Sequence, residues 1–281
     1  MASTPISIVD AGAPAEADGG WYLEHSALFN RCNLSPWAIA SQTFQENPKP
    51  LEIAWVRQEN QAFFDLLGTL ASPAERAACF HDYVLSRFWL HEDRAHWPSE
   101  AERLRASYVA VLRGWGLDSN GASGAVLKGW AEHRFGLRAI WHRTALSRDD
   151  AASERYAAER MRGALAGIGM QLDLLYTFCQ DELRRRHPGE RWLRLYRGTH
   201  DAESYTVKRL VGRDELVEFN TVSSFTDDAE LAWAFGSRVW SVRVPLEKIV
   251  YFTGLIPNGL LTGEQERIVL GGDYVVRALT C

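Results

Sequence analysis

Residues 183–199 read LRRRHPGERWLRLYRGT, and the spacing of apolar side chains changes inside this stretch. Up to Leu183, apolar residues recur every three or four positions, which is the period of a helix with one buried face. The HPG at 187–189 predicts the end of that helix. Proline lacks the N–H group that a helix interior needs, and glycine readily adopts the left-handed conformation that follows many helix ends. Beyond it, Leu193 and Leu195 alternate with polar residues, which is the period of a strand. The stretch therefore predicts a change from helical to β structure.

The helical pattern covers about residues 21–187. Its longest predicted helix spans about 152–186, with an apolar stripe formed by Leu165, Ile168, Leu172, Leu175, Cys179 and Leu183. Two earlier helices have clear start signals, SPAE at 72–75 and SEAE at 99–102, in which serine and glutamate three positions apart form a capping box. We expect the second of these helices to end at the glycines of its last turn, Gly114 and Gly116, after presenting Leu104, Tyr108 and Leu112 on one face.

The strand pattern covers the C-terminal third. The predicted strands are residues 193–197, 216–225, 239–244, 249–252, 267–270 and 274–279, with one short helix at 227–235 between them. The predicted fold class is α+β, a helical N-terminal part followed by a β-rich core. We expect three segments: a flexible leader at residues 1–20, the helical part at 21–189 and the β-rich part at 190–281.

Composition excludes several classes of protein. The 281 residues are 46% hydrophobic, enough for a sizeable core, and a net charge of -5 lacks the basic footprint of nucleic-acid binding. The four cysteines show no C-x-x-C spacing, so we expect neither a zinc ribbon nor a disulfide framework, and a reducing cytoplasm is the expected location. We also expect neither a signal peptide nor a membrane span.

Two motifs in the helical part do not support the chemistry they suggest. HEDRAH at 91–96 has histidines five positions apart, whereas a zinc-protease helix needs them four apart on one face. The glycines at 114, 116 and 121 lack the spacing of a dinucleotide-binding loop and follow a helix instead of a strand. The tryptophans of this part are numerous enough to form a sugar or base platform, but most of them are better interpreted as core anchors. They are Trp21, Trp37, Trp55, Trp89, Trp97, Trp115, Trp130 and Trp141.

The first signal of function is Arg197, which ends an apolar strand and is followed by Gly198 and Thr199. An arginine in this place often forms only a salt bridge. Its guanidinium can also hold a pyrophosphate through paired hydrogen bonds, and a glycine beside it lets a flat ring approach the backbone. The residues alone leave both interpretations open.

The second and third signals follow in the chain. TVSSFT at 221–226 places small hydroxyl groups on a strand that leads into a helix, although Thr226 or Asp227 could serve only as the helix N-cap. GLLTGEQE at 259–266 places Glu264 and Glu266 on one side of a strand start, where two carboxylates repel each other. A structural role does not need that repulsion, so the pair indicates function. The alternative is a purely structural role, in which Glu264 caps a turn or pairs with the neighbouring Arg267.

Taken together, Arg197, the strand at 224–226 and the EQE at 264–266 resemble the arginine, Ser-Thr-Ser and Glu-x-Glu motifs of the cholera-toxin-like ADP-ribosyltransferases. This resemblance covers roughly residues 192–279. The chain length, the long helical part and the phrases LYRGTH and NTVSSFT are also similar to the bacterial dinitrogenase reductase ADP-ribosyltransferase family. The resemblance implies that the β-rich part at 190–281 is an NAD-binding ADP-ribosyltransferase core.

The chain departs from the wider family at two places. Phe225 stands where threonine is usual and Thr226 where the second serine is usual, which leaves Ser223 and Ser224 as candidates for the motif serine. Strand parity favours Ser224, because it shares a face with Thr226. The loop before the glutamates has Leu260 and Leu261 where many relatives have an aromatic recognition residue.

The resemblance implies a mono-ADP-ribosyltransferase that moves ADP-ribose from NAD to a protein arginine. Glu266 would stabilise the oxocarbenium-like ribose, Ser224 would orient Glu266, and Arg197 would hold the NAD phosphates. Glu264 would align the incoming guanidine and help to remove its proton. The residues expected to contact NAD are Arg197, Gly198, Thr199, Ser224, Thr226, Phe235 and Glu266. NAD is the co-substrate, and no step requires a metal.

The resemblance also implies partners. The expected substrate is the nitrogenase iron protein, whose reversible inactivation regulates nitrogen fixation, and a PII-type signalling protein is an expected regulator. We expect the helical residues 21–187 to carry substrate recognition or a regulatory docking surface. Two alternatives stay open: an NAD glycohydrolase or a transferase with another protein target, and a non-catalytic NAD-sensing or partner-binding module.

Overall fold

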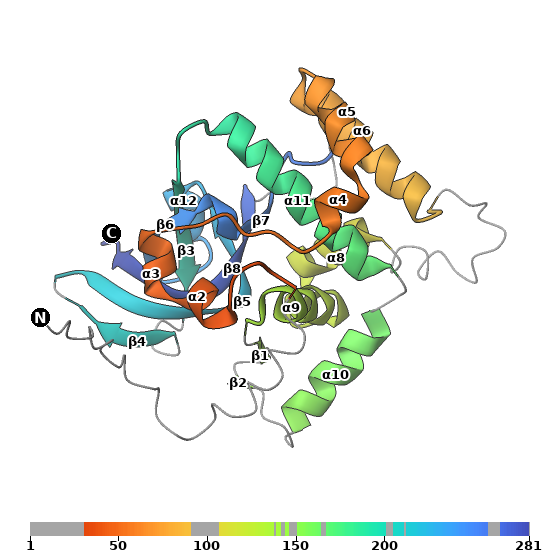
Figure 1. Ribbon diagram of the computed structural model, residues 1–281. Helices are drawn as coiled ribbons and strands as arrows, with labels where there is room; N and C mark the ends of the chain where they lie inside the picture. Colours follow the sequence, from red (N-terminus) through yellow and green to blue (C-terminus); the bar gives the residue numbers. More distant parts are fainter. Residues whose placement is uncertain are drawn as a thin grey trace, which may run out of the picture.

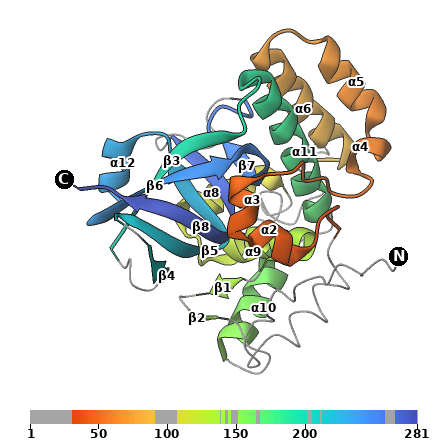
Figure 2. The same cartoon turned by 60° about the vertical axis from the view of Figure 1, so that its left-hand side comes forward.

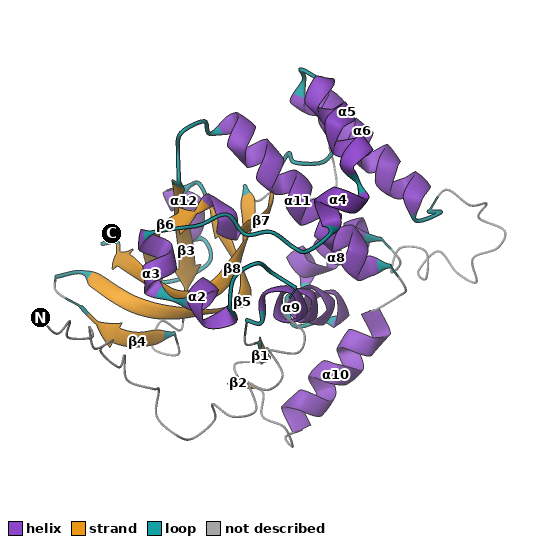
Figure 3. Cartoon of the chain, viewed as in Figure 1, coloured by secondary structure: helices purple, strands orange, loops and turns teal. Residues whose placement is uncertain are grey.

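The computed structural model describes residues 31–90, 107–137, 139–141, 144–145, 151–163, 167–200, 205–210, 212–257 and 265–280 (Figure 1). Helices form most of the N-terminal part and strands most of the C-terminal part, as Figure 3 shows, so the predicted α+β class is confirmed. The predicted leader at 1–20, the histidines at 91–96, the capping box at 99–102 and Glu264 lie outside the described residues.

The helices before the sheet are α2 (Pro36–Ala40), α3 (Gln42–Glu46), α4 (Val56–Glu59), α5 (Gln61–Thr69), α6 (Pro73–Arg87), α8 (Tyr108–Leu117), α9 (Ala122–Phe135), α10 (Ala151–Gly163) and α11 (Ile168–Arg186). The capping box predicted at the start of α6 is present. The Ser72 hydroxyl accepts from the Ala74 N–H, and the Ser72 N–H donates to the Glu75 carboxylate, both at 3.2 Å. None of the described helices has the length and apolar character that a membrane crossing requires.

Helix α8 passes Gly114 and ends one residue after Gly116, so only the second of the two predicted glycines marks its end. The helix follows the N-cap Ser107 and continues to Leu117. Gly114 serves packing instead, because a Cβ atom there would lie 2.2 Å from the hydroxyl oxygen of Ser123 on α9. The missing side chain lets α8 and α9 approach closely.

The single long helix predicted over about 152–186 is two helices, α10 and α11. Gly167, the N-cap of α11, has a φ of +90°, a left-handed conformation that a continuous helix cannot contain. The apolar stripe is nevertheless correct from Ile168 on, because α11 buries Ile168, Leu172, Leu175, Cys179 and Leu183, whereas Leu165 lies outside the described residues. The stop at HPG is also correct, since α11 ends at Arg186.

The strands of the C-terminal part are β3 (Trp192–Thr199), β4 (Thr206–Arg209), β5 (Asp214–Thr226), β6 (Arg238–Pro245), β7 (Ile249–Phe252) and β8 (Glu266–Ala278). Helix α12 (Ala229–Trp233) follows β5, and the 3-10 helix η3 (Leu246–Lys248) precedes β7. The antiparallel sheet has the order β4-β5-β3-β6-β8-β7. Strand β5 also pairs with β8, which closes β3, β6, β8 and β5 into a ring.

The sheet differs from the predicted strands in two respects. The strands expected at 267–270 and 274–279 are one strand, β8, which passes through Gly271 and Gly272. A Cβ atom at Gly271 would lie 1.9 Å from the Asn220 carbonyl oxygen, and the β5–β8 register shifts at this place, as in a β-bulge. Strand β4 and the short pair β1 (Ile140–Trp141) and β2 (Thr144–Ala145) were not predicted.

Helix α11 lies between the sheet and the helices α4 and α6 (Figures 1 and 2). On the sheet side, the Gln180 amide donates to the carbonyl oxygens of Leu246 and Ile249 at 3.0 and 2.8 Å. Helix α9 packs on β5. One cluster of buried apolar side chains contains residues of both parts, so the helices and the sheet share a core.

Candidate active site

Arg197 lies on β3 with its guanidinium half-buried among aromatic rings. Its Nη1 donates to the Ser224 carbonyl oxygen at 2.6 Å, whereas its buried Nε has no hydrogen-bond partner among the described residues. The guanidinium carbon lies 5.8 to 5.9 Å from the ring centroids of Tyr205, Phe219 and Phe225. Aromatic faces stabilise a cation, but an unpaired buried N–H still costs free energy. A bound anion would satisfy this donor.

Ser224 and Glu266 meet because β5 and β8 are neighbours, with Thr226 directly opposite Glu266. The Ser224 hydroxyl donates to Glu266 Oε1 at 2.5 Å. The Glu266 side chain is buried, and its backbone is held by Thr253, whose hydroxyl accepts from the Glu266 N–H at 3.0 Å and whose N–H donates to the Glu266 carbonyl at 2.9 Å. The carboxylate is therefore held at the start of β8 by both its backbone and its side chain.

A pocket of about 260 Å³ contains these groups. It is lined by Tyr196, Arg197, Gly198, Ser224, Phe225, Thr226, Leu231, Ala232, Phe235 and Glu266. All of the residues predicted to contact NAD line it except Thr199, which is buried outside the lining. Ser223 is also buried and does not line the pocket, whereas Ser224 does, as strand parity predicts.

Helix α12 forms one wall of the pocket, and its close packing explains why residue 198 is a glycine. A Cβ atom on Gly198 would lie 1.9 Å from the carbonyl oxygen of Ala232, and one on Gly236 would lie 2.2 Å from the backbone nitrogen of Thr199. The two glycines let α12 and the chain after it pack directly on the end of β3. Gly198 therefore gives room for this helix, and its predicted contact with a flat ring stays a prediction.

The N-cap of α12 is Asp228, not Thr226 or Asp227. The Asp228 carboxylate accepts from the backbone N–H groups of the first turn, and the Thr226 hydroxyl accepts from the Asp228 N–H at 3.1 Å. Asp227 instead binds Arg267 through two hydrogen bonds of 2.5 and 2.7 Å. Arg267 thus already has a carboxylate partner. Glu264 lies outside the described residues, so its role toward the acceptor stays a prediction.

Trp115 on α8 is a site residue that sequence reasoning missed. Its indole N–H donates both to Ser224 Oγ at 2.9 Å and to Glu266 Oε1 at 3.0 Å. The sequence interpretation assigned most tryptophans to the core. Trp115 and Trp130 are indeed buried, but Trp37, Trp55 and Trp89 are exposed, so for these three the prediction is wrong. No motif surrounds it in the chain, and only the packing of α8 against the sheet shows its second role.

Lys128 on α9 is a buried cation that lies over the Trp115 ring. Its Nζ lies 5.9 Å from the centroid of the Trp115 ring and donates to the Asn120 side-chain oxygen at 3.1 Å. Burial lowers the pKa of Lys128 to about 8; Asp118 opposes this shift, and the nearby Arg197 adds to it. Among the described residues, Lys128 thus lies against the Trp115 ring, and Arg197 is bound to the Ser224 carbonyl.

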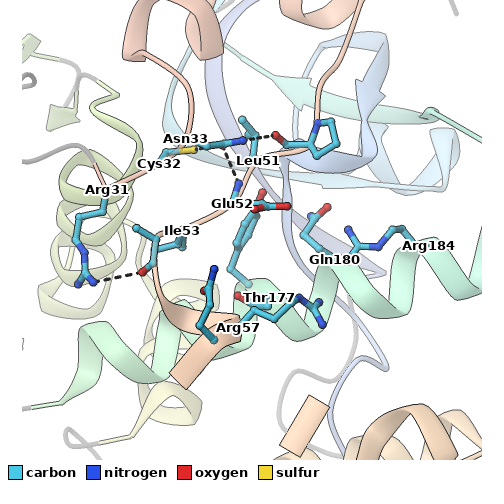
Figure 4. A pocket seen from close by; sticks show the side chains of 14 residues that line it. Arg31, Cys32, Asn33, Leu51, Glu52, Ile53, Arg57, Thr177, Gln180 and Arg184 are labelled. Carbon is cyan, nitrogen blue, oxygen red and sulfur yellow. Dashed lines mark hydrogen bonds between the residues drawn. The ribbon is translucent and has the colours of Figure 1, made fainter. Parts of the chain in front are cut away.

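A second pocket, of about 210 Å³, lies between two N-terminal segments and α11 (Figure 4). Arg31, Arg57 and Arg184 line it, but Arg57 and Arg184 both pair with Asp181, and Arg31 donates to the Ala54 carbonyl. None of the predicted site residues lines this pocket. Within the described part of the chain, no cluster of three or more His, Cys, Asp or Glu side chains is placed to hold a metal ion.

An arginine on one strand, a serine on the next and a buried glutamate bound to that serine form a site that resembles that of the cholera-toxin-like ADP-ribosyltransferases. Comparison with protein families supports this class. Residues 29–278 match the family described as dinitrogenase reductase ADP-ribosyltransferase, so the chain belongs to this family. The match includes the helices as well as the sheet.

The chain is also similar to the NAD(+)--dinitrogen-reductase ADP-D-ribosyltransferase of Rhodospirillum rubrum. The two are 38% identical over 258 residues, which cover 89% of this chain and 94% of that protein. No solved structure matches the chain. The family and this relative confirm the predicted enzyme class, an ADP-ribosyltransferase with NAD as co-substrate.

Proposed function

We propose that this protein transfers ADP-ribose from NAD to an arginine of the nitrogenase iron protein (dinitrogenase reductase), reversibly inactivating it and so regulating nitrogen fixation. The family and the name of the relative from Rhodospirillum rubrum support the reaction and the target. The observation that carries the site assignment is the Ser224–Glu266 hydrogen bond beside the half-buried guanidinium of Arg197.

Arg197 is the proposed contact for the phosphates of NAD. Its Nη1 is already bound to the Ser224 carbonyl, which fixes the plane of the guanidinium. The remaining donors include the buried Nε, which lacks a protein partner among the described residues. The planar guanidinium of arginine presents several N–H donors that can bind two phosphate oxygens at once. A buried N–H donor also binds a charged acceptor more strongly than a neutral one. Phe235 and Thr226 line the same pocket and would contact other parts of the dinucleotide.

Glu266 is the proposed catalytic carboxylate. As the bond between nicotinamide and ribose breaks, positive charge develops on the sugar, and a carboxylate in a buried site stabilises that charge strongly. Ser224 holds this carboxylate through a neutral hydroxyl group, which orients it without adding a positive charge. Glu264 would align the acceptor guanidine and help remove its proton.

The helical residues 21–189 are proposed to recognise the protein substrate or a regulator, with residues 190–281 as the catalytic core. A PII-type signalling protein is the proposed regulator, and a reducing cytoplasm is the proposed location, in keeping with the scattered cysteines. The family match over both parts supports a role for the helices in this specific reaction.

Incubation of the purified protein with labelled NAD and purified nitrogenase iron protein tests the proposal. Label on the iron protein is the expected result, and loss of that label when the target arginine is replaced would assign the acceptor. Release of free ADP-ribose without protein labelling would indicate an NAD glycohydrolase. Neither product would indicate a non-catalytic module.

A further inference from the structure

Trp115 places a single N–H group between the two motif residues of the site. The group lies 2.9 Å from Ser224 Oγ and 3.0 Å from Glu266 Oε1, and the serine hydroxyl itself donates to the same Oε1. The three groups form a closed triangle of hydrogen bonds. An indole N–H can only donate, so in this triangle the carboxylate oxygen is the common acceptor.

The position of Trp115 is set by the helical part. Helix α8 is held close to α9 at Gly114, and α9 packs on β5, the strand that carries Ser224. The indole is 4% exposed, and Lys128 on α9 lies against its ring. A side chain packed on all sides keeps one rotamer, so its N–H has a fixed direction.

We propose that Trp115 is a positioning residue for the ADP-ribosyl transfer, holding the Glu266 carboxylate in its reactive orientation from outside the catalytic core. This inference rests on the proposed function of Glu266. The helical part therefore completes the active site, in addition to any role in recognition.

The chemistry of the donor supports this role. A lysine or arginine on Glu266 would neutralise the charge that must stabilise the cationic sugar. Trp115 and Ser224 are neutral donors, so these two hydrogen bonds orient the carboxylate without cancelling its charge.

The test is Trp115→Phe, which keeps an aromatic ring and removes the N–H. A hydrogen bond to a charged group contributes about 1.5–3 kcal/mol, so we expect kcat for nicotinamide release to fall about 10- to 100-fold. The KM for NAD should change less than about threefold, because Trp115 does not line the NAD pocket. The matched control is Trp130→Phe: Trp130 is also 4% exposed, and its N–H donates to the Asp173 carboxylate at 2.8 Å, away from the site. The control should lose thermal stability and keep kcat.

Two further measurements keep the test decisive. If Trp115→Phe does not fold, a benzothiophene analogue of tryptophan at position 115 removes only the N–H and should show the same loss of kcat. Independently of activity, the indole 15N–1H NMR signal of Trp115 should shift in Glu266→Gln, whereas that of Trp130 should not. Equal kcat in the Trp115 variant and the Trp130 control, or an unshifted Trp115 signal, would overturn the inference. A wild-type protein that never releases nicotinamide would instead overturn the proposed function, while the NMR result would still decide whether Trp115 holds Glu266.

Discussion

The catalytic role proposed for Glu266 makes Glu266→Gln the most informative single substitution. Glutamine has nearly the same shape, and its amide oxygen can accept the hydrogen bonds that Oε1 receives from Ser224 and Trp115. The backbone bonds to Thr253 do not depend on the side chain. The variant therefore changes the charge of the site and little of its packing.

The expected loss follows from that charge. Removing one preorganised electrostatic group from an active site typically costs about 3 kcal/mol or more of transition-state stabilisation. At about 1.4 kcal/mol for each factor of ten, kcat should fall roughly 100-fold or further. Both transfer to the iron protein and hydrolysis of NAD should be lost, since both require the same cationic sugar.

The assay measures nicotinamide release and protein labelling on the same sample, with circular dichroism melting as the check of folding. Glu230→Gln, the same chemical change at an exposed position on α12, is the control and should keep both activities. A folded Glu266→Gln protein that still hydrolyses NAD at a near-normal rate would refute the reasoning.

Three further predictions follow from the site. Arg197→Lys should weaken NAD binding about tenfold or more without unfolding the protein, because lysine cannot reproduce a two-donor contact with phosphate; unchanged affinity in calorimetry would contradict the phosphate assignment. Glu264→Gln should keep slow nicotinamide release with water as acceptor and lose transfer to arginine, since a guanidine needs more precise alignment than water; parallel loss of both activities would count against a separate acceptor role. In the folded protein the pKa of Lys128 is about 8 against its ordinary value of 10.5, so between these values the unfolded chain binds more protons and the free energy of unfolding rises with pH. Lys128→Met should make that rise smaller in denaturant titrations at several pH values, and an unchanged slope would show that Lys128 is not held in a desolvated environment.

The predictions from sequence succeeded where the signal is local. The capping box at Ser72, the buried stripe of α11 and the stop after Arg186 each depend on residues a few positions apart. They failed at glycines, where the same residue has several uses. Gly114 was interpreted as a helix end but serves a helix–helix contact, and Gly167 breaks a helix that looked continuous.

By itself the sequence determined the α+β class, the boundary at HPG and the fact that Ser224 and Thr226 share one face of their strand. Periodicity and strand parity follow from the geometry of a single element. It also predicted which side chains perform the chemistry, since Arg197 and Glu266 stand in motifs that resemble those of a known family. Only the tertiary structure decided that β5 and β8 close the strands into a ring and bring Ser224 onto Glu266, residues 42 positions apart. Only packing could place Trp115 against them, over separations of 109 and 151 positions, because such contacts depend on how whole helices lie on the sheet and leave no periodic trace in the chain.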